Sequence, residues 1–182
     1  MSWVILGILI LVGVWVIGIY NGLVQLRVRG DGAWSDIDVQ LKRRYDLIPN
    51  LVETVKGYAA HEKGVFQSVT EARTRAMSAA SPSAKGEAEQ GLAGALKTLF
   101  AVAENYPQLR ASENFQGLQS SLTQVEEAIQ NSRRYYNAVV RDYNTKISVI
   151  PDSFIASLGG FKAKEFFQPD SVEERKNVKV SF

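Results

Sequence analysis

His61 and Glu62 are the residues whose types and spacing come nearest to a known catalytic pattern. His61 is the only histidine of the sequence, and a histidine followed by a glutamate begins the zinc-binding motif of metalloproteases. That motif needs a second histidine four residues after the first, where this sequence has Val65. We therefore interpret His61 as a surface residue on a helix flank. An enzyme that uses His61 and Glu62 stays as an alternative.

Other chemistry-bearing patterns in the sequence are also incomplete. Asp36 and Asp38 could hold a cation together with other oxygens, but residues two apart on a helix point to different sides. The sequence has no cysteine, and hence no thiolate nucleophile, disulfide or sulfur ligand for a metal. It contains neither a phosphate-binding loop nor a nucleophile-elbow motif. We expect no catalytic residue, no cofactor and no metal.

Polar residues that interrupt apolar stripes are more informative. The stripes consist of apolar residues at alternating steps of three and four, which is typical of packed helices, and Arg44, Glu62 and Ser132 fall within them. A buried charge without a partner is costly, so Arg44 and Glu62 must pair, lie at an edge or face another chain. On one helix they would lie about 27 Å apart, so they cannot pair with each other there. We favour register-setting ion pairs within a bundle, with contacts to a partner chain as the alternative.

The segment RRYDLIPNLVE, residues 43–53, places Pro49 inside an amphipathic pattern. An interior proline lacks a backbone donor and costs about 3 kcal/mol. The apolar stripe nevertheless keeps its phase from Trp34 to Ala76, which favours one long helix that bends at Pro49. In the alternative, Asp46 caps a helix that begins here and Pro49 lies in its first turn. The candidate interaction or register-setting residues are Arg44, Asp46, Pro49, Asn50, Glu62 and Ser132.

The apolar stretch at residues 3–20 has the length and composition of a membrane-spanning helix. It begins at Trp3 and ends at Tyr20, where interfacial aromatic residues would stand. A cleaved signal peptide is the alternative, but no Lys or Arg precedes the stretch and no small-residue cleavage site follows it. Gly18 and Gly22 have a spacing that lets membrane helices approach closely, and together with the kinked helix that follows the span and the wide apolar stripes this spacing predicts a homo-oligomer.

Two further helices follow the first, and together they predict an all-α fold. Their apolar stripes run over residues 92–106, where Pro107 ends the pattern, and over residues 115–143. Long helices with short connections pack antiparallel, which predicts an up-down bundle behind the membrane helix. We expect a membrane anchor and juxtamembrane segment at residues 1–26, a helical bundle at 27–150 and a short extended C-terminal arm at 151–182.

The arm carries aromatic residues that need burial. Leaving Phe161, Phe166 and Phe167 in water would forgo about 1.5 to 3 kcal/mol for each side chain, so residues 154–167 should fold back on the bundle. The last five residues, VKVSF, alternate like a strand and either dock as an extended arm, pair with a neighbouring copy or stay disordered.

Charge sets limits on partners and on orientation. The 21 basic and 19 acidic residues give a net charge of +2, which makes nucleic acid a poor partner. Arg27 and Arg29 follow the apolar stretch and no cation precedes it, so the positive-inside rule favours a cytoplasmic bundle. A bundle on the periplasmic or extracellular side is the alternative.

Several segments carry a resemblance to a known family. They are YNGLV, AWSDIDVQLKRRYDLIPNLVETVKGYAAHEK, VTEAR, NFQGLQSSLTQVEEAIQNSRRYYNAVVRDYN and FFQ. In these segments the chain resembles the LemA family of bacterial membrane proteins. The resemblance implies a single-pass anchor in the bacterial cytoplasmic membrane and an antiparallel helical bundle, and it implies little chemistry. We expect a membrane-anchored scaffold or interaction protein that self-associates, with an accessory subunit or regulator of a membrane enzyme as the alternative.

Overall fold

The computed structural model describes residues 1–167, and every regular element in that range is a helix. The helices are α1 (Ser2–Lys56), α2 (Lys63–Ser78), α3 (Pro82–Glu104), α4 (Pro107–Arg110), α5 (Glu113–Ser148) and α6 (Asp152–Leu158). No strand occurs in this part of the chain, so the predicted all-α class is confirmed. The VKVSF segment lies outside the described residues.

The chain packs as two compact units, which are described separately. The first unit consists of Met1–Val39 and Gln130–Glu165. The second consists of Gln40–Ile129 together with Phe166 and Phe167. Helices α1 and α5 each contribute residues to both units.

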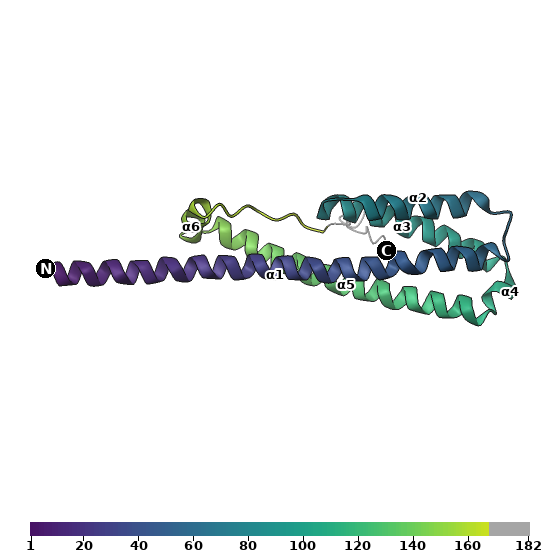
Figure 1. The fold of residues 1–182 in the computed structure, drawn as a ribbon, viewed down its shortest axis with the longest axis horizontal. Helices are drawn as coiled ribbons and strands as arrows, with labels where there is room; N and C mark the ends of the chain where they lie inside the picture. The colour runs from purple at the N-terminus through teal and green to yellow at the C-terminus, as the bar shows by residue number, and fades with distance from the viewer. Residues whose placement is uncertain (168–182) are drawn as a thin grey trace, which may run out of the picture. The chain divides into compact units, whose positions relative to one another are not determined.

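The second unit is an up-down bundle of the end of α1, then α2, α3 and the start of α5 (Figure 1). The sequence at the start of α3 is typical of a helix N-terminus. The Ser81 hydroxyl accepts a hydrogen bond from the Ala84 N–H, and Pro82 follows in the first turn of α3, where a missing donor costs nothing. Each helix buries a stripe of apolar side chains, among them Leu41, Ile48, Leu51, Val55, Val69, Ala76, Leu92, Leu99, Leu122 and Ile129.

The first helix runs through Pro49 without a break, as the phase of its apolar stripe predicted. The prediction that this helix continues to Ala76 is wrong, because α1 ends at Lys56 and a turn at residues 57–62 leads into α2. Gly57 is a poor helix former, and the N–H groups of Tyr58 and Ala59 both bond to the carbonyl of Val55. The turn folds the two stripes onto one core, and Tyr58 is left exposed.

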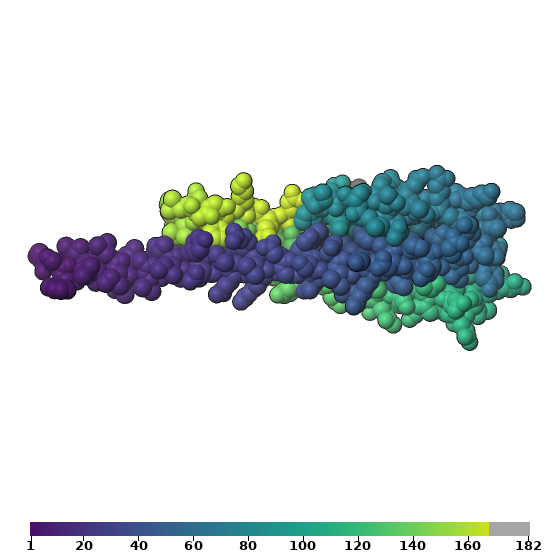
Figure 2. All heavy atoms as spheres, in the orientation of Figure 1, coloured from purple at the N-terminus to yellow at the C-terminus, as the bar shows by residue number. Residues whose placement is uncertain are grey.

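The first unit contains the apolar N-terminal part of α1. An 18-residue window of this helix has a mean hydropathy of 2.6, and none of it is buried, so it is long and apolar enough to cross a membrane. Figure 2 shows this end of α1, in purple, standing free of other elements. Packing begins at its end, where Leu23 forms a small core with Tyr143, Ala156 and Phe161.

The C-terminal arm buries its aromatic residues unequally. Phe161 and Phe167 are buried, as expected, and Phe166 is half-buried. Phe154, the first residue of the segment expected to fold back, has a side chain that is 64% exposed. The reason is that α6 packs through its other face, on which Ala156 is buried.

Candidate functional site

The most unusual group in the second unit is a buried ionic cluster centred on Arg44. One guanidinium nitrogen of Arg44, Nη1, lies 3.0 Å from Oε2 of Glu89 on α3 and 3.1 Å from Oε2 of Glu126 on α5. The Arg44 and Glu89 side chains are only 7% and 8% exposed, whereas Glu126 is 42% exposed. Arg44 of α1 therefore links α1 to α3 and to α5. Because the Glu126 carboxylate is in contact with solvent, only Arg44 and Glu89 are buried as charged groups.

Tyr45 completes the surroundings of Glu89. Its hydroxyl donates a hydrogen bond to Oε1 of Glu89, so both carboxylate oxygens have a partner. Burial raises the pKa of Glu89 above its ordinary value of 4.5, while the Tyr45 hydrogen bond and the charge of Arg44 act in the opposite direction. Because its oxygens are occupied and its side chain is covered, Glu89 joins helices and is not presented to a substrate.

Pro49 contributes to this region through the donor that it lacks. In a regular helix the N–H of residue 49 would bond to the carbonyl of Tyr45, and proline has no N–H to donate to it. Instead, Nε of Arg73 on α2 donates a hydrogen bond of 2.8 Å to the Tyr45 carbonyl oxygen. The proline thereby turns a bond within α1 into a bond between α1 and α2.

The remaining predicted residues lie apart from this cluster. Asp46 and Asn50 are exposed on α1, and the Asn50 carbonyl accepts a hydrogen bond from the Thr54 hydroxyl. Glu62 directly precedes α2 and makes no side-chain capping bond there. Ser132 is half-buried on α5. Of the six candidates, Arg44 belongs to the ionic cluster and Pro49 affects the carbonyl of Tyr45, whereas Asp46, Asn50 and Glu62 take no part in these ion pairs and Ser132 belongs to the first unit.

Sequence reasoning missed Tyr45, Arg73, Glu89 and Glu126. A signal existed for Glu89, because it precedes Leu92 by three residues and so continues the apolar stripe of α3 toward its start. No comparable signal marks Arg73. Its role follows from a carbonyl on another helix, and a pattern within α2 cannot reveal it.

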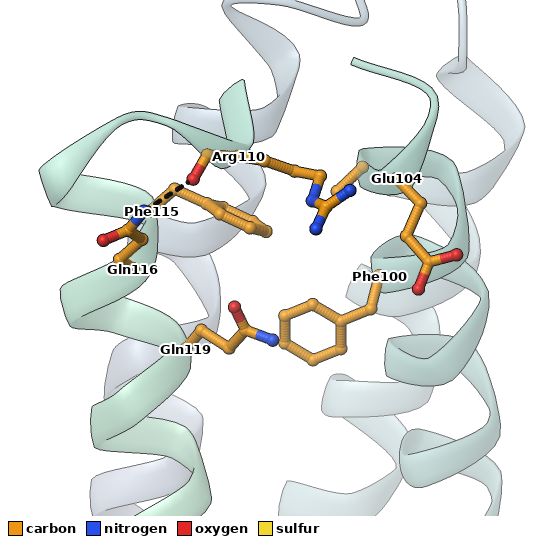
Figure 3. A pocket seen from close by; sticks show the side chains of 7 residues that line it. Phe100, Glu104, Arg110, Phe115, Gln116 and Gln119 are labelled. Atoms are coloured by element: carbon orange, nitrogen blue, oxygen red, sulfur yellow. Dashed lines mark hydrogen bonds between the residues drawn. The ribbon is translucent and has the colours of Figure 1, made fainter. Parts of the chain in front are cut away.

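A hollow opens where α3, α4 and α5 meet, at the other notable place in the second unit. It encloses about 530 Å³, and its lining comprises Phe100, Ala103, Glu104, Arg110, Phe115, Gln116 and Gln119. Figure 3 shows the rings of Phe100 and Phe115 facing the hollow, with polar side chains around them. The Gln116 amide donates to the Arg110 carbonyl at 2.9 Å. Four of the seven lining residues are polar or charged, so the hollow presents mainly polar groups around the two aromatic rings.

In the first unit, side chains of α5 form hydrogen bonds with the backbone of the C-terminal arm. The hydroxyls of Tyr136 and Tyr143 donate to the carbonyls of Glu165 and Lys162, at 2.8 and 2.9 Å. The Asn144 side chain both donates to the Lys164 carbonyl and accepts from the Lys164 N–H. These hydrogen bonds end on backbone atoms of the arm, so they fix its path whichever side chains it carries.

The tyrosine hydroxyls of this arrangement stay protonated. Burial, followed by the nearby charges of Glu165 and Asp31, raises the pKa of Tyr136 to about 12. Burial also raises the pKa of Tyr143, and the charge of Arg27 partly opposes this. Both hydroxyls therefore remain donors at any physiological pH.

The two glycines proposed for membrane-helix packing differ in their surroundings. A side-chain atom added at Gly18 would meet nothing within 4 Å. One added at Gly22 would lie 3.3 Å from Cε of Lys146 in the same chain. Within the structure, Gly18 is therefore open to another helix, whereas the face of Gly22 is occupied by α5.

Residues 1–167 contain no group of three or more His, Asp or Glu side chains that could hold a metal ion. His61 is exposed. The described chain thus combines a helix that could span a membrane with a bundle held by a buried ionic cluster, which defines the class of anchored helical-bundle proteins.

The chain belongs to the LemA family, whose sequence model matches residues 33–182. It is 27% identical to two proteins of Paramagnetospirillum magneticum, magnetosome protein MamQ 1 and magnetosome protein MamQ 2, over 82% of this chain. It is 25% identical to magnetosome protein MamQ of Magnetospirillum gryphiswaldense, over 81% of this chain. The match spans 64% of the length of each of these relatives.

Proposed function

We propose that this LemA-family protein is a membrane-anchored helical scaffold, in which α1 crosses the bacterial cytoplasmic membrane and the folded part binds other proteins. The observation that carries the proposal lies in the first unit. Residues 2–18 of α1 are exposed except for half-buried Val16, and packing begins at Ile19 and Tyr20, where the apolar stretch ends, and continues with Leu23. An exposed apolar helix of this length needs a bilayer, and the packed core starts where the bilayer would end.

The proposal divides the chain into an anchor at residues 1–26, a bundle at 27–150 and a C-terminal arm at 151–182. The bundle lies on the cytoplasmic side, since the cations nearest the apolar stretch are Arg27 and Arg29. Reporter fusions at the two ends of the chain test this orientation.

Self-association forms part of the proposal. Gly18 is open on the surface of the span, and small residues allow close approach of membrane helices. We expect Gly18→Leu to lower the oligomeric mass of the chain in nanodiscs, while Gly7→Leu, another open glycine of the span, serves as the matched control. A monomeric wild-type chain at all concentrations would remove self-association and leave the anchor proposal intact.

The hollow beside Phe100 is the surface that we assign to a protein partner. Two aromatic rings surrounded by polar side chains, among them Arg110 and Glu104, offer a partner both ring contacts and charged contacts. Crosslinking in native membranes through a photoreactive residue at Gln119 should capture a partner that Arg110→Glu no longer binds. A site at exposed Gln67 on α2 provides the control.

The proposed function is not enzymatic, and it can be separated from chemistry at His61 and Glu62. A chain with both His61→Ala and Glu62→Gln should fold, reach the membrane and keep its partners. If such a chain behaved like a deletion while still folding and reaching the membrane, chemistry at these residues would replace the scaffold proposal.

A further inference from the structure

We propose that α6 and the turn before it form a second membrane contact, which enters the interfacial layer of the bilayer that α1 crosses. The residues that enter are Val149, Ile150, Phe154 and Leu158. This inference rests on the proposed anchor and adds to it a site that meets lipid headgroups and the upper part of the acyl chains.

The exposure of these side chains is the first observation. Val149, Ile150, Phe154 and Leu158 are 46%, 78%, 64% and 87% exposed. Phe154 and Leu158 are four residues apart within α6 and therefore lie on one side of that helix, and Val149 and Ile150 lie in the turn directly before it. Large apolar side chains gathered on a short segment mark a contact with a partner or a membrane, whereas scattered ones need no explanation.

The opposite side of α6 is already occupied. Ala156 is buried in the core with Leu23, Tyr143 and Phe161, and Ile155 packs against that core. The helix is therefore apolar on two sides and has only one of them covered. The side that carries Phe154 and Leu158 makes no packing contact within the first unit that would bury it.

The position of α6 indicates that the bilayer covers its exposed apolar side. The core that holds α6 includes Leu23 of α1, and Ile19 and Val24 pack against it. The Tyr20 ring lies 5.5 Å from the ring of Phe161, which follows α6 in the chain. Figure 1 shows α6 beside α1, next to the N-terminal stretch. The exposed side chains thus stand at the level where the apolar stretch ends, so a bilayer around that stretch has its interface at α6.

The charges around α6 also suit this layer. Arg27 lies 5.2 Å from the centre of the Phe161 ring, and Lys162 is exposed nearby in the chain. The acid at the start of α6, Asp152, is paired with Lys146 at 2.7 Å, which reduces its repulsion of anionic headgroups. Interfacial segments bury their apolar side by about 5–10 Å and keep cations at headgroup level.

Single labels can measure the depth of each position, because the chain has no native cysteine. We would make Phe154→Cys, Leu158→Cys and Ile150→Cys separately in the full chain and attach a nitroxide to each. The chains would be placed in nanodiscs of phosphatidylethanolamine and phosphatidylglycerol. Collision with oxygen, which concentrates in lipid, would be compared with collision with a water-soluble nickel chelate.

Two positions on α1 calibrate the measurement. Leu9→Cys reports the proposed span, where the native side chain is 63% exposed. Val39→Cys reports a residue of the same unit whose side chain is 51% exposed but lies about 24 Å beyond Leu23 along the helix. All the labelled α6 residues are more than half exposed, so labelling leaves the core of the unit intact.

The proposal predicts a several-fold higher ratio of oxygen to nickel collisions at Ile150, Phe154 and Leu158 than at Val39, with depths shallower than at Leu9. Ratios equal to that at Val39, with Leu9 still in lipid, would overturn the α6 contact while the anchor stands. Low collision rates with both reagents would mean that a protein surface or a second copy covers α6, and this would also overturn it. A water-exposed Leu9 would overturn the anchor and the α6 contact together.

Discussion

Arg44 in the second unit and Asn144 in the first hold neighbouring segments in different ways. Arg44 uses full charges, and its partners Glu89 and Glu126 are particular side chains on two other helices. Asn144, like Tyr143, uses a neutral side chain that bonds to the backbone of the arm. The first arrangement depends on the identity of every member, and the second depends mainly on the path of the chain.

The difference has a physical consequence for substitutions. Removing one member of a buried charged set leaves an uncompensated charge, whereas a backbone carbonyl is present whichever residue carries it. The bundle should therefore be sensitive to side-chain changes at its cluster. The arm should be sensitive to changes that alter its backbone path and tolerant of most others.

Arg44→Met should have the largest effect, because it leaves Glu89 buried without its cation. We expect a loss of about 3 kcal/mol or more in the free energy of unfolding, measured by chemical denaturation of the full chain in detergent. Lys56→Met is the control, since Lys56 and Glu53 form an exposed pair at 3.1 Å whose loss should change stability by at most about 1 kcal/mol.

The same comparison can be made sharper with a double substitution. Arg44→Met combined with Glu89→Leu removes both buried charges, so it should recover most of the stability lost in Arg44→Met. Equal stability of Arg44→Met and Lys56→Met would show that the cluster is not desolvated, and the contrast between the two regions would be lost.

Gly159→Ala tests whether the arm depends on its path. A Cβ at Gly159 would lie 2.6 Å from the Phe161 ring and 3.2 Å from the Ile155 carbonyl, so the ring must leave its place. We expect a loss of about 1 to 3 kcal/mol, as in overpacked cores, together with faster hydrogen exchange around Phe161. Gly117→Ala in α5, where a Cβ meets nothing within 4 Å, should instead raise stability by about 0.5 to 1 kcal/mol.

Tyr143→Phe removes one neutral bond to the arm and leaves the Lys162 carbonyl without this donor. A loss of about 1 kcal/mol in the free energy of unfolding is expected. Tyr135→Phe provides the control, since Tyr135 is 55% exposed and should change stability little. A loss as large as that of Arg44→Met would mean that the two regions do not differ in the way described.

The hydrogen bond from Arg73 to the Tyr45 carbonyl should depend on Pro49. Arg73→Met removes this donor from the carbonyl, and Pro49→Ala supplies an N–H from within α1 in its place. Arg73→Met should therefore cost about 0.5 to 1.5 kcal/mol less in the Pro49→Ala background than in the wild type. Additive effects in a double-mutant cycle would show that the proline does not serve this bond.

The smallest expected effect is a pH dependence at Glu89. Because burial raises the folded-state pKa of this carboxyl above 4.5, the folded chain binds its proton more tightly than the unfolded chain. The resulting stabilisation is fully present below pH 4.5 and is lost as the pH rises through the folded-state pKa. Relative to Glu89→Gln, the wild type should lose stability across that interval. A relative gain would mean that the Arg44 and Tyr45 contacts outweigh burial.

The main elements of the fold could be predicted from sequence because they depend on local patterns. The apolar stretch predicted the exposed N-terminal helix, and the unchanged phase across Pro49 predicted that α1 continues through it. The same phase hid the turn at residues 57–62. Val55 and Val69 lie two seven-residue repeats apart, so a hairpin of this length keeps the pattern of a single helix.

The candidate site was less predictable because its contacts join distant segments. The charge of Arg44 within an apolar stripe predicted a partner on another element, but the pattern could not select Glu89 or Glu126. Glu62 falls in the apolar stripe that predicted one helix as far as Ala76. Because α1 ends at Lys56, Glu62 lies instead at the end of the turn before α2. The arm contacts of Asn144 end on backbone atoms, which carry no sequence signal at all.

Extraction of membranes combined with intact mass measurement tests the central claim most directly. Membranes from cells that express the full chain would be washed with alkaline carbonate, and the mass of the chain would be measured in the pellet and in the supernatant. A membrane-anchored chain is expected to stay in the pellet with residues 3–20 still attached. Release into the supernatant, or a chain that begins beyond residue 20, would contradict a membrane-anchored scaffold.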